Sequence, residues 1–424
     1  MSEIVVMKFG GTSVADAERI KRAAARIVEK RESGYGVVAV LSARGKTTDE
    51  LISMAEEVSA VPAPREMDML LSTGERISCA LCAMAINDLG HRAISLTGSQ
   101  AGIVTDTSHT KARILDVRAD RVRAALEQDH IVLVAGFQGV STTDDVTTLG
   151  RGGSDTTAVA VAAALGAREC EIYTDVDGVF SADPRIVPDA RKLPTVSFEE
   201  MLEMAASGAG VLQLRSVEYA RNHMVRIHCR SSFNDSPGTV VVSEGESMDN
   251  PERPLITAVT HSTSDSMITL IGVRHEPGVA ARIFEAMADA NVNVDMIDQN
   301  VPTSAGGNAE ISFTVPHEDL RVATAALHPM TDEVFAGVRT QREMGKVSIV
   351  GAGMRSHPGV AAKVFRVLND EGINIEMIST SPIKISCVIA RAQVERAVQA
   401  LHGAFELSGP GTLGAEEPFR ERAG

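Results

Sequence analysis

Residues 146–167 read VTTLGRGGSDTTAVAVAAALGA. The first half is a glycine-rich loop that holds one cation, one hydroxyl and one carboxylate, on Arg151, Ser154 and Asp155. The second half consists of small residues and predicts a helix that packs closely against its surroundings. Charges of both signs at the start of a helix suit a zwitterionic ligand, although alone they also fit a helix cap with a surface ion pair.

Around this stretch, residues 1–245 alternate short apolar runs with helical patterns. The runs are rich in Val and Ile and are bounded by Gly, Ser or Asp; they read IVVMKF, GVVAVLS, IVLVAGFQG and ECEIYTDV. This order predicts an α/β domain over 1–245, with a mostly parallel sheet sandwiched by helices. Ligands of such sheets gather at the carboxyl ends of the strands, and the polar clusters of this chain directly follow strand-like runs.

The composition changes after this domain. Residues 243–254, SEGESMDNPERP, are polar and acidic and predict a linker. Beyond it, HEPGVAARIFEAMADANVNVDMI (275–297) recurs as SHPGVAAKVFRVLNDEGINIEMI (356–378), with a period of about 80 residues. We therefore expect residues 255–424 to contain two α+β, ferredoxin-like modules, at about 265–340 and 341–410. They serve either as a sensor attached to an enzyme or as purely structural modules.

The composition of the chain limits which partners and which cellular compartment we expect for the protein. The chain has 424 residues and a formal net charge of −15, which disfavours nucleic acid as a partner. No apolar run reaches the roughly 18 residues of a membrane helix, and the N-terminus has no signal-peptide pattern. The five cysteines are scattered, and the Cys79–Cys82 pair has apolar neighbours that predict a buried helical turn. We expect a cytoplasmic protein with no membrane partner.

Two further segments suit a nucleotide. In KFGGTSVADAERI, Lys8 ends a strand and two glycines precede a helix start, so that backbone N–H groups and one cation can hold phosphate. In YTDVDGVFSADPRIV, acidic residues and Arg185 follow a strand, as suits a nucleotide with its magnesium ion. Each segment alone is also compatible with an ordinary turn.

Together these motifs resemble one family. KFGGTSVADAERI, SARGKTTDEL, TGERIS, GFQGV, TTLGRGGSDTTAVAVAAALGA and EIYTDVDGVFSADPRIV follow the order and spacing of the aspartokinase catalytic domain, of the amino-acid kinase superfamily. The tail is similar to that family's paired ACT domains, and the resemblance covers nearly the whole chain. It implies ATP- and Mg²⁺-dependent phosphorylation of the side-chain carboxylate of L-aspartate to 4-phospho-L-aspartate, the first step toward lysine, threonine and methionine.

The resemblance also implies roles for individual residues. Lys8 and Asp155 would be catalytic. The aspartate-binding residues would be Ser42, Thr48, Glu75, Arg151, Gly153 and Ser154. The nucleotide would contact Lys8, Phe9, Gly10, Gly11, Thr174, Asp175, Asp177, Phe180 and Arg185. No dedicated metal ligands are expected, because Mg²⁺ is implied by the phosphates. An amino-acid effector such as threonine would meet Gly278, Ala280, Gln299, Asn374 and Ile375.

Some positions depart from the family pattern. Gly210, in GAGVLQLRS, stands where the family usually has a nucleotide-contacting lysine. His275, Pro302, Ala361 and Pro382 replace an aspartate, a serine, a threonine and a glutamate of lysine-inhibited relatives. These changes remove groups that would hold a cationic effector, so we expect lysine inhibition to be weakened while a threonine response persists.

The resemblance leaves several readings open. ACT modules usually pair across subunits, which implies a homo-oligomer or an α/β hetero-oligomer with a shorter chain from an internal start. The chain is either the aspartokinase of primary metabolism or a paralogue with relaxed feedback in a specialised pathway. A third reading is a catalytically impaired amino-acid-binding regulator, which Gly210 favours and which Lys8, Glu75, Arg151 and Asp155 oppose. The C-terminal residues 408–424 are expected to be poorly ordered.

Overall fold

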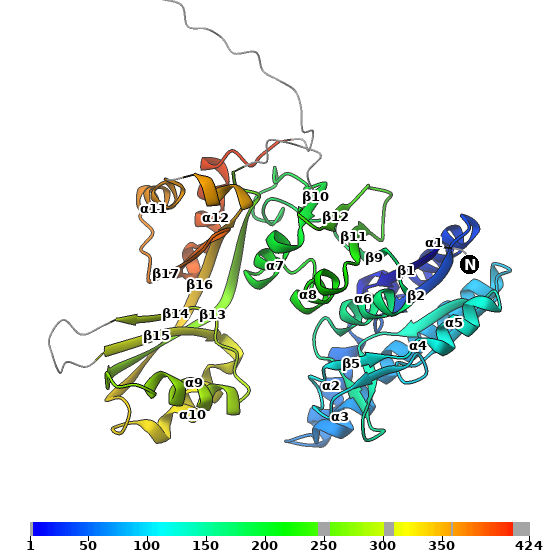
Figure 1. Cartoon of the computed structure of the whole chain (residues 1–424), viewed down its shortest axis with the longest axis horizontal. Coiled ribbons are helices and arrows are strands. Elements are labelled where there is room, and N and C mark those ends of the chain that lie inside the picture. Colours follow the sequence, from blue (N-terminus) through cyan, green and yellow to red (C-terminus); the bar gives the residue numbers. More distant parts are fainter. Residues whose placement is uncertain (1–2, 245–254, 301–308, 358, 410–424) are drawn as a thin grey trace, which may run out of the picture.

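The computed structural model describes residues 3–244, 255–300, 309–357 and 359–409 (Figure 1). The predicted linker falls mostly, and the predicted C-terminal tail almost entirely, outside these residues, and so does Pro302. Two bodies are joined near α7 (Phe198–Ala206): an α/β body that contains the N-terminus and a second body built on long antiparallel strands.

The N-terminal body is organised around an eight-stranded sheet. Its order is β10-β12-β11-β9-β1-β2-β6-β3, and every neighbouring pair is parallel except β11 and β12. The strands are β1 (Ile4–Phe9), β2 (Gly36–Leu41), β3 (Ala93–Leu96), β6 (Ile131–Ala135), β9 (Glu169–Thr174), β10 (Thr195–Ser197), β11 (Arg226–Ser231) and β12 (Thr239–Val242). The mostly parallel α/β fold class predicted from the sequence is confirmed.

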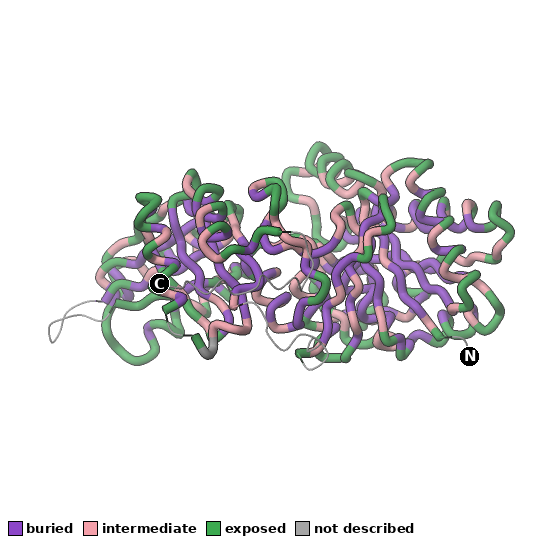
Figure 2. Tube along the Cα trace, turned by 90° about the horizontal axis from the view of Figure 1, so that it is seen from above, coloured by how far each residue is buried: buried purple, intermediate pink, exposed green. Residues whose placement is uncertain are grey.

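Helices cover both faces of this sheet, because its central strands are apolar on both sides. Alternate residues of β1 divide between the faces: Val5 and Met7 pack with α1 (Ala17–Glu32) and α4 (Thr73–Asp88), whereas Val6 packs toward the other face. The second face carries α5 (Asp120–Glu127), α6 (Gly153–Leu165), α7 and α8 (Leu214–His223). Figure 2 shows the strands as the buried layer inside each body.

Helix α6 is the most deeply enclosed of the described helices of this body. Eleven of its thirteen residues are buried, since its Ala and Val side chains let the helix lie close to the sheet. The helix ends at Gly166, whose φ of +71° is a left-handed cap that glycine adopts without strain. The close packing expected for the second half of residues 146–167 is confirmed.

A smaller sheet and two helices lie beside the main sheet. The sheet has the order β5-β4-β7-β8, from β4 (Ile103–Thr105), β5 (Ile114–Val117), β7 (Gln138–Ser141) and β8 (Val146–Thr148). The helices are α2 (Thr47–Val58) and α3 (Pro64–Leu71). By length and composition alone, the helical stretch Pro64–Asp88 would be able to cross a membrane. Half of its most apolar window is buried, and Cys79 and Cys82 lie in the core on α4, as in the core helix of a globular domain.

The second body is one six-stranded antiparallel sheet with the order β14-β15-β13-β16-β18-β17. Its strands are β13 (Ala258–Val273), β14 (Ile297–Asn300), β15 (Ala309–Pro316), β16 (Gly337–Val350), β17 (Met377–Ser381) and β18 (Lys384–Ala390). The helices are α9 (Val279–Asp289), α10 (Leu320–Leu327), α11 (Val360–Asp370) and α12 (Val394–Ala404). The repeat predicted from the sequence is therefore present as two α+β modules that share one sheet.

The two modules exchange strand segments. The first half of β13 pairs with the second half of β16, next to β18, whereas the second half of β13 pairs with the first half of β16, next to β15. Accordingly Ile256 and Val259 belong to the core of the second module, and Ile268 and Leu270 to that of the first. The module limits placed near 265 and 341 do not mark this exchange, because the sequence repeat begins only after the shared strands.

Side-chain and backbone bonds join the two bodies. The Val259 N–H donates to the Ser181 carbonyl at 2.7 Å, and the Thr257 hydroxyl donates to Glu200 Oε1 at 2.6 Å. Lys384 forms an ion pair with Glu203 of α7 at 2.8 Å. The first half of β13 is thus held against the N-terminal body by buried polar contacts.

Candidate active site

The site lies at the carboxyl ends of β1, β2 and β9, which are neighbours in the sheet. After β1 the chain turns through Gly10 into a short 3₁₀ helix, Gly11–Val14, and the Gly10 N–H donates to the Tyr173 carbonyl at 3.2 Å. A Cβ on Gly11 would lie 2.8 Å from the Ala43 carbonyl oxygen, so the loop after β2 can approach only because this residue is glycine. Backbone N–H groups here are available for an anion.

An ion pair joins the motif KFGG at the end of β1 to the motif GRGGSD at the start of α6. Lys8 Nζ lies 2.5 Å from Asp155 Oδ1, and the two side chains are only 11% and 8% exposed. Asp155 is in the first turn of α6, where the helix dipole favours negative charge. The turn before it depends on Gly152, with φ of +72°, and on Gly153, where a Cβ would lie 2.8 Å from Leu149 Cβ. The structure thus brings Lys8 and Asp155 together at a buried point.

Glu75 is a buried carboxylate with spare hydrogen-bonding capacity. It lies in the first turn of α4 and is 3% exposed. Oε1 accepts a hydrogen bond from the Ala43 N–H at 3.2 Å, whereas Oε2 has no partner among the residues that the structure describes. Burial raises the pKa of Glu75 to about 7, against the opposing effect of backbone hydrogen bonds. Such a group is suited to receive a cation.

The remaining predicted aspartate-binding residues lie around this point. Ser42 and Thr48 are half-buried, at the end of β2 and in the first turn of α2. Ser154 is buried at the start of α6, and a Cβ on Gly136 would lie 2.7 Å from its hydroxyl oxygen. Arg151 is exposed on the loop before α6. Its guanidinium is therefore accessible to an anionic ligand.

The loop of Arg151 is anchored by residues that the sequence analysis missed. Arg215 of α8 donates from Nη1 to the Leu149 carbonyl at 2.7 Å. Asp68 of α3, fully buried, accepts from the Thr148 hydroxyl at 2.5 Å and from the Thr110 N–H at 3.0 Å. The available signal was a charged residue within the apolar run MDMLL.

A cavity of about 480 Å³ opens beyond the end of β9. Of the predicted nucleotide contacts, it is lined by Thr174, Asp175, Phe180 and Arg185, whereas Lys8, Gly10 and Gly11 are not among its lining residues. Asp177 is not among the lining residues, and its carboxylate accepts from the Asn234 side-chain amide at 2.7 Å. Phe9 is also absent from the lining, because its ring stacks on Tyr173 in the core, with centroids 4.8 Å apart.

The same cavity is also lined by residues that were not among the predicted nucleotide contacts. Gly210 lines it, and a Cβ at this position would meet nothing within 4 Å. Three residues of β13, Val259, Thr260 and His261, also line it. The cavity is therefore closed on one side by a strand of the second body.

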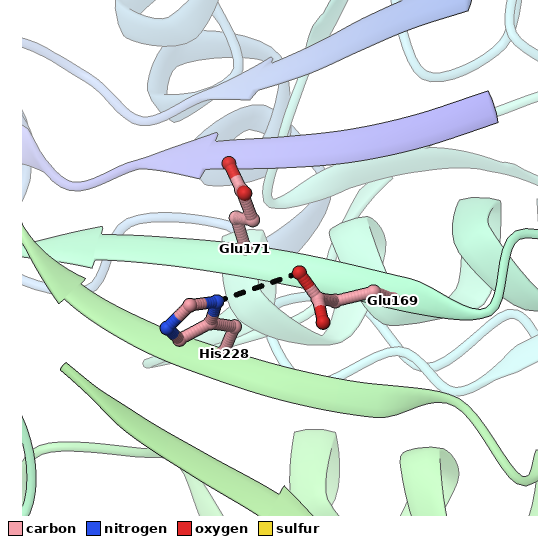
Figure 3. Close-up of side chains that lie close together, drawn as sticks. All are labelled: Glu169, Glu171 and His228. Carbon is pink, nitrogen blue, oxygen red and sulfur yellow. Dashed lines mark hydrogen bonds and ion pairs between the residues drawn. The ribbon is translucent and has the colours of Figure 1, made fainter. Parts of the chain in front are cut away.

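A separate cluster of Glu169, Glu171 and His228 has donor atoms close enough to hold a metal ion (Figure 3). Its charges are already compensated: the Lys30 ammonium donates to Glu171 at 2.7 Å, and the Tyr173 hydroxyl donates to the same carboxylate at 3.0 Å. The hydrogen bond with His228 lowers the pKa of Glu169. The cluster also starts at the opposite end of β9 from the cavity, so it is a structural ion network.

The predicted effector residues are not all together within one chain. Gly278, Ala280 and Gln299 line a cavity of about 370 Å³ in the first module, beside His275. A cavity of about 450 Å³ at the equivalent place in the second module includes Ala361 and Pro382 in its lining. Asn374 and Ile375 line neither cavity; they lie before β17, and the Asn374 amide donates to Glu376.

Comparison with known proteins agrees with this architecture. Residues 3–231 match the model of the amino acid kinase family, and residues 268–330 and 347–405 match that of an ACT domain. The aspartokinase of Mycolicibacterium smegmatis is 56% identical over 409 residues, covering 96% of this chain and 97% of that protein.

Two crystal structures of E. coli aspartokinase III also match, each at 26% identity. The complex with aspartate and ADP (R-state) has a TM-score of 0.82 and covers 95% of this chain and 99% of that one. The complex with lysine and aspartate (T-state) has a TM-score of 0.72 and covers 95% and 100%.

The kinase body, the site at its strand ends and the ACT sheet define a phosphotransferase with an attached regulatory region. Since a relative of 56% identity extends over nearly the whole chain, the chain belongs to the aspartokinase family. The resemblance read from the sequence motifs is confirmed, and so is the enzyme class.

The burial of Glu75 has a measurable pH signature. Because its pKa is raised from 4.5 to about 7, the folded state loses stability relative to a neutral residue as pH rises through this window. The difference in the free energy of unfolding, Glu75→Gln minus wild type, should therefore increase by up to about 3 kcal/mol as the pH is raised from 5 to 8. Urea titrations across this range would measure it. The exposed Glu57→Gln is the control, and parallel curves for Glu75→Gln and wild type would contradict the assignment.

Proposed function

We propose that the chain transfers the γ-phosphoryl group of ATP to the side-chain carboxylate of L-aspartate, giving ADP and 4-phospho-L-aspartate. The observation that carries this proposal is the buried Lys8–Asp155 ion pair. It lies at the strand ends between a cluster suited to a zwitterion, around Glu75 and Arg151, and the cavity that begins at Thr174.

The first cluster would bind aspartate by its backbone charges. Glu75, with one unpaired carboxylate oxygen, receives the ammonium group, and the exposed Arg151 guanidinium clamps the α-carboxylate. The remaining polar contacts are assigned to Ser42, Thr48, Gly153 and Ser154. With both charged groups of the amino-acid backbone fixed, the side-chain carboxylate points toward the phosphates.

The transfer itself needs alignment more than proton removal. The attacking carboxylate has a pKa of about 4 and is ionised at pH 7, so no strong general base is required. One carboxylate oxygen forms a bond to the γ-phosphorus while the bond to the bridging β,γ-oxygen breaks, and ADP leaves with the electron pair. Lys8 offsets the repulsion between the two anions, and Asp155 holds its ammonium group in position.

The nucleotide would occupy the cavity of about 480 Å³. The turn at Gly10 and Gly11 adjoins the cavity through the bond from the Gly10 N–H to the Tyr173 carbonyl, and its remaining backbone N–H groups would meet the phosphates. Thr174, Asp175, Phe180 and Arg185 would contact the rest of the nucleotide. Phe9 and Asp177 would support the nucleotide-contacting residues indirectly. Phe9 stacks on Tyr173, and the Asp177 carboxylate accepts a hydrogen bond from Asn234. Mg²⁺ would be held mainly by the phosphates, and the exposed Asp175 carboxylate in the cavity lining would be able to supply a protein oxygen.

Alanine substitutions distinguish the proposed role of Lys8 in catalysis from that of Arg151 in aspartate binding. Lys8→Ala should lower kcat by about 10²–10³-fold, because a charge that stabilises the transition state is lost. Arg151→Ala should act mainly on the KM for aspartate. Both are measured by trapping the acyl phosphate with hydroxylamine, with the exposed, remote Arg121→Ala as control. Full phosphorylation activity in Lys8→Ala would refute the proposed chemistry.

Gly210 gives a test by gain of function. The position lines the cavity and has open space around its missing Cβ, so a lysine side chain can enter without displacing a neighbour. Gly210→Lys should lower the KM for ATP by adding a cation to the wall of the cavity that the anionic nucleotide enters. Gly210→Met, of similar length without charge, is the control; an unchanged or higher KM for ATP in the lysine variant would show that this place no longer faces the nucleotide.

We further propose that the regulatory region responds to amino acids with weakened sensitivity to lysine. His275, Ala361 and Pro382 border the module cavities and supply no carboxylate for a cationic effector. Because Asn374 and Ile375 lie away from the cavity of Gly278, a second chain would complete the effector site, so the working form is an oligomer. The product would feed the cytoplasmic synthesis of lysine, threonine and methionine.

Effector titrations test this regulation. Threonine alone should inhibit turnover, and lysine alone should have little effect at the same millimolar concentrations. The hydroxamate assay with each amino acid, singly and together, gives the comparison. Strong inhibition by lysine alone would contradict the altered specificity.

A further inference from the structure

We propose that the start of β13 is part of the nucleotide site, and that the Thr260 hydroxyl forms a hydrogen bond with the adenosine moiety of the bound nucleotide. Residues 259–261 lie beyond the predicted linker and belong by sequence to the regulatory region. The inference rests on the proposed function only in taking an adenine nucleotide as the ligand of the cavity.

The strand is inserted between the two loops that form the cavity. On one side, the Val259 N–H donates to the Ser181 carbonyl at 2.7 Å. On the other side, a Cβ on Gly208 would lie 1.9 Å from the His261 carbonyl oxygen, and Gly208 has φ of +106°. Only glycine permits this approach, so β13 is fixed as a wall of the cavity.

The two ends of the cavity differ in chemistry. Thr174 and Asp175 border the turn at Gly10, where the phosphates are expected. The wall that includes β13 combines the apolar side chains of Met204, Val211 and Val259 with Thr260 and His261. An apolar wall with few polar groups suits the base and ribose of a nucleotide better than its phosphates.

Thr260 supplies one of those polar groups. The residue is 5% exposed, and its hydroxyl oxygen is buried with no hydrogen-bond partner in the described part of the chain. Other hydroxyls of the same strand region are paired: Thr257 donates to Glu200 at 2.6 Å, and Thr269 bonds to Ser312 at 3.0 Å. A buried hydroxyl left unpaired costs stability, and a ligand in the cavity would provide the missing partner.

Calorimetric titration of the full chain with ADP tests the inference. Thr260→Val keeps the shape of the side chain and removes the hydroxyl, so the Kd for ADP should rise about three- to tenfold, with a matching rise in the KM for ATP and none in that for aspartate. Thr260→Ser, which keeps the hydroxyl, should have the wild-type Kd for ADP. Thr269→Val, a buried threonine of the same strand outside the cavity, should leave it unchanged.

Analogues locate the partner atom. If the Thr260→Val effect disappears with purine riboside diphosphate, the hydroxyl contacts the 6-amino group; if it disappears with 2′-deoxyADP, it contacts the 2′-hydroxyl; if it persists with both, it contacts a ring nitrogen or another ribose oxygen. A wild-type Kd in a folded Thr260→Val chain would overturn the inference, whereas failure of the wild type to bind ADP would overturn the proposed function instead.

Amide hydrogen exchange on the unaltered chain keeps the test independent of how the variants fold. ADP should slow exchange in a peptide that spans residues 257–263. If ADP protects the loop 174–185 but not this peptide, β13 is not part of the site.

Discussion

Repulsion between a carboxylate and a triphosphate is the constraint around which this site is built. In the proposed chemistry Lys8 supplies the positive charge, and its ion pair with Asp155 holds that charge at a buried point. The position of the pair depends on β1 and α6 lying against each other, which the small residues of α6 allow. The glycine turns at Gly10–Gly11 and Gly152–Gly153 then let backbone N–H groups and loops approach closely.

The sequence predicts those parts of the molecule that local patterns determine. Alternating apolar runs and helical segments predict the mostly parallel sheet, because a strand buried on both faces needs a continuous run of Val and Ile. The repeat predicts two similar modules. Lys8 and Asp155 could be selected because a charged residue next to a glycine turn is chemically informative, and the structure brings the two into contact. Glu75 is predicted only through the family resemblance of its motif.

Other features depend on contacts between distant segments and have no local signature. Asp68 and Arg215 lie within helices α3 and α8, and only the folded chain shows that both hold the loop before α6. Phe9 and Asp177 follow the motif, yet the stack on Tyr173 and the bond from Asn234 keep their side chains out of the cavity. The exchange of strand halves between β13 and β16 is likewise invisible, because each half looks like an ordinary strand.

That exchange limits how far the two bodies can be treated as separable parts. A chain ended at residue 245 would retain every kinase motif but would lose Val259, Thr260 and His261, and with them one wall of the cavity beside β9. It would also leave Glu200 without Thr257 and Ala352 as partners. A crossover between relatives in the linker would therefore part the catalytic body from strand residues that complete its cavity, even though one of them, Val259, also packs in the core of the second module.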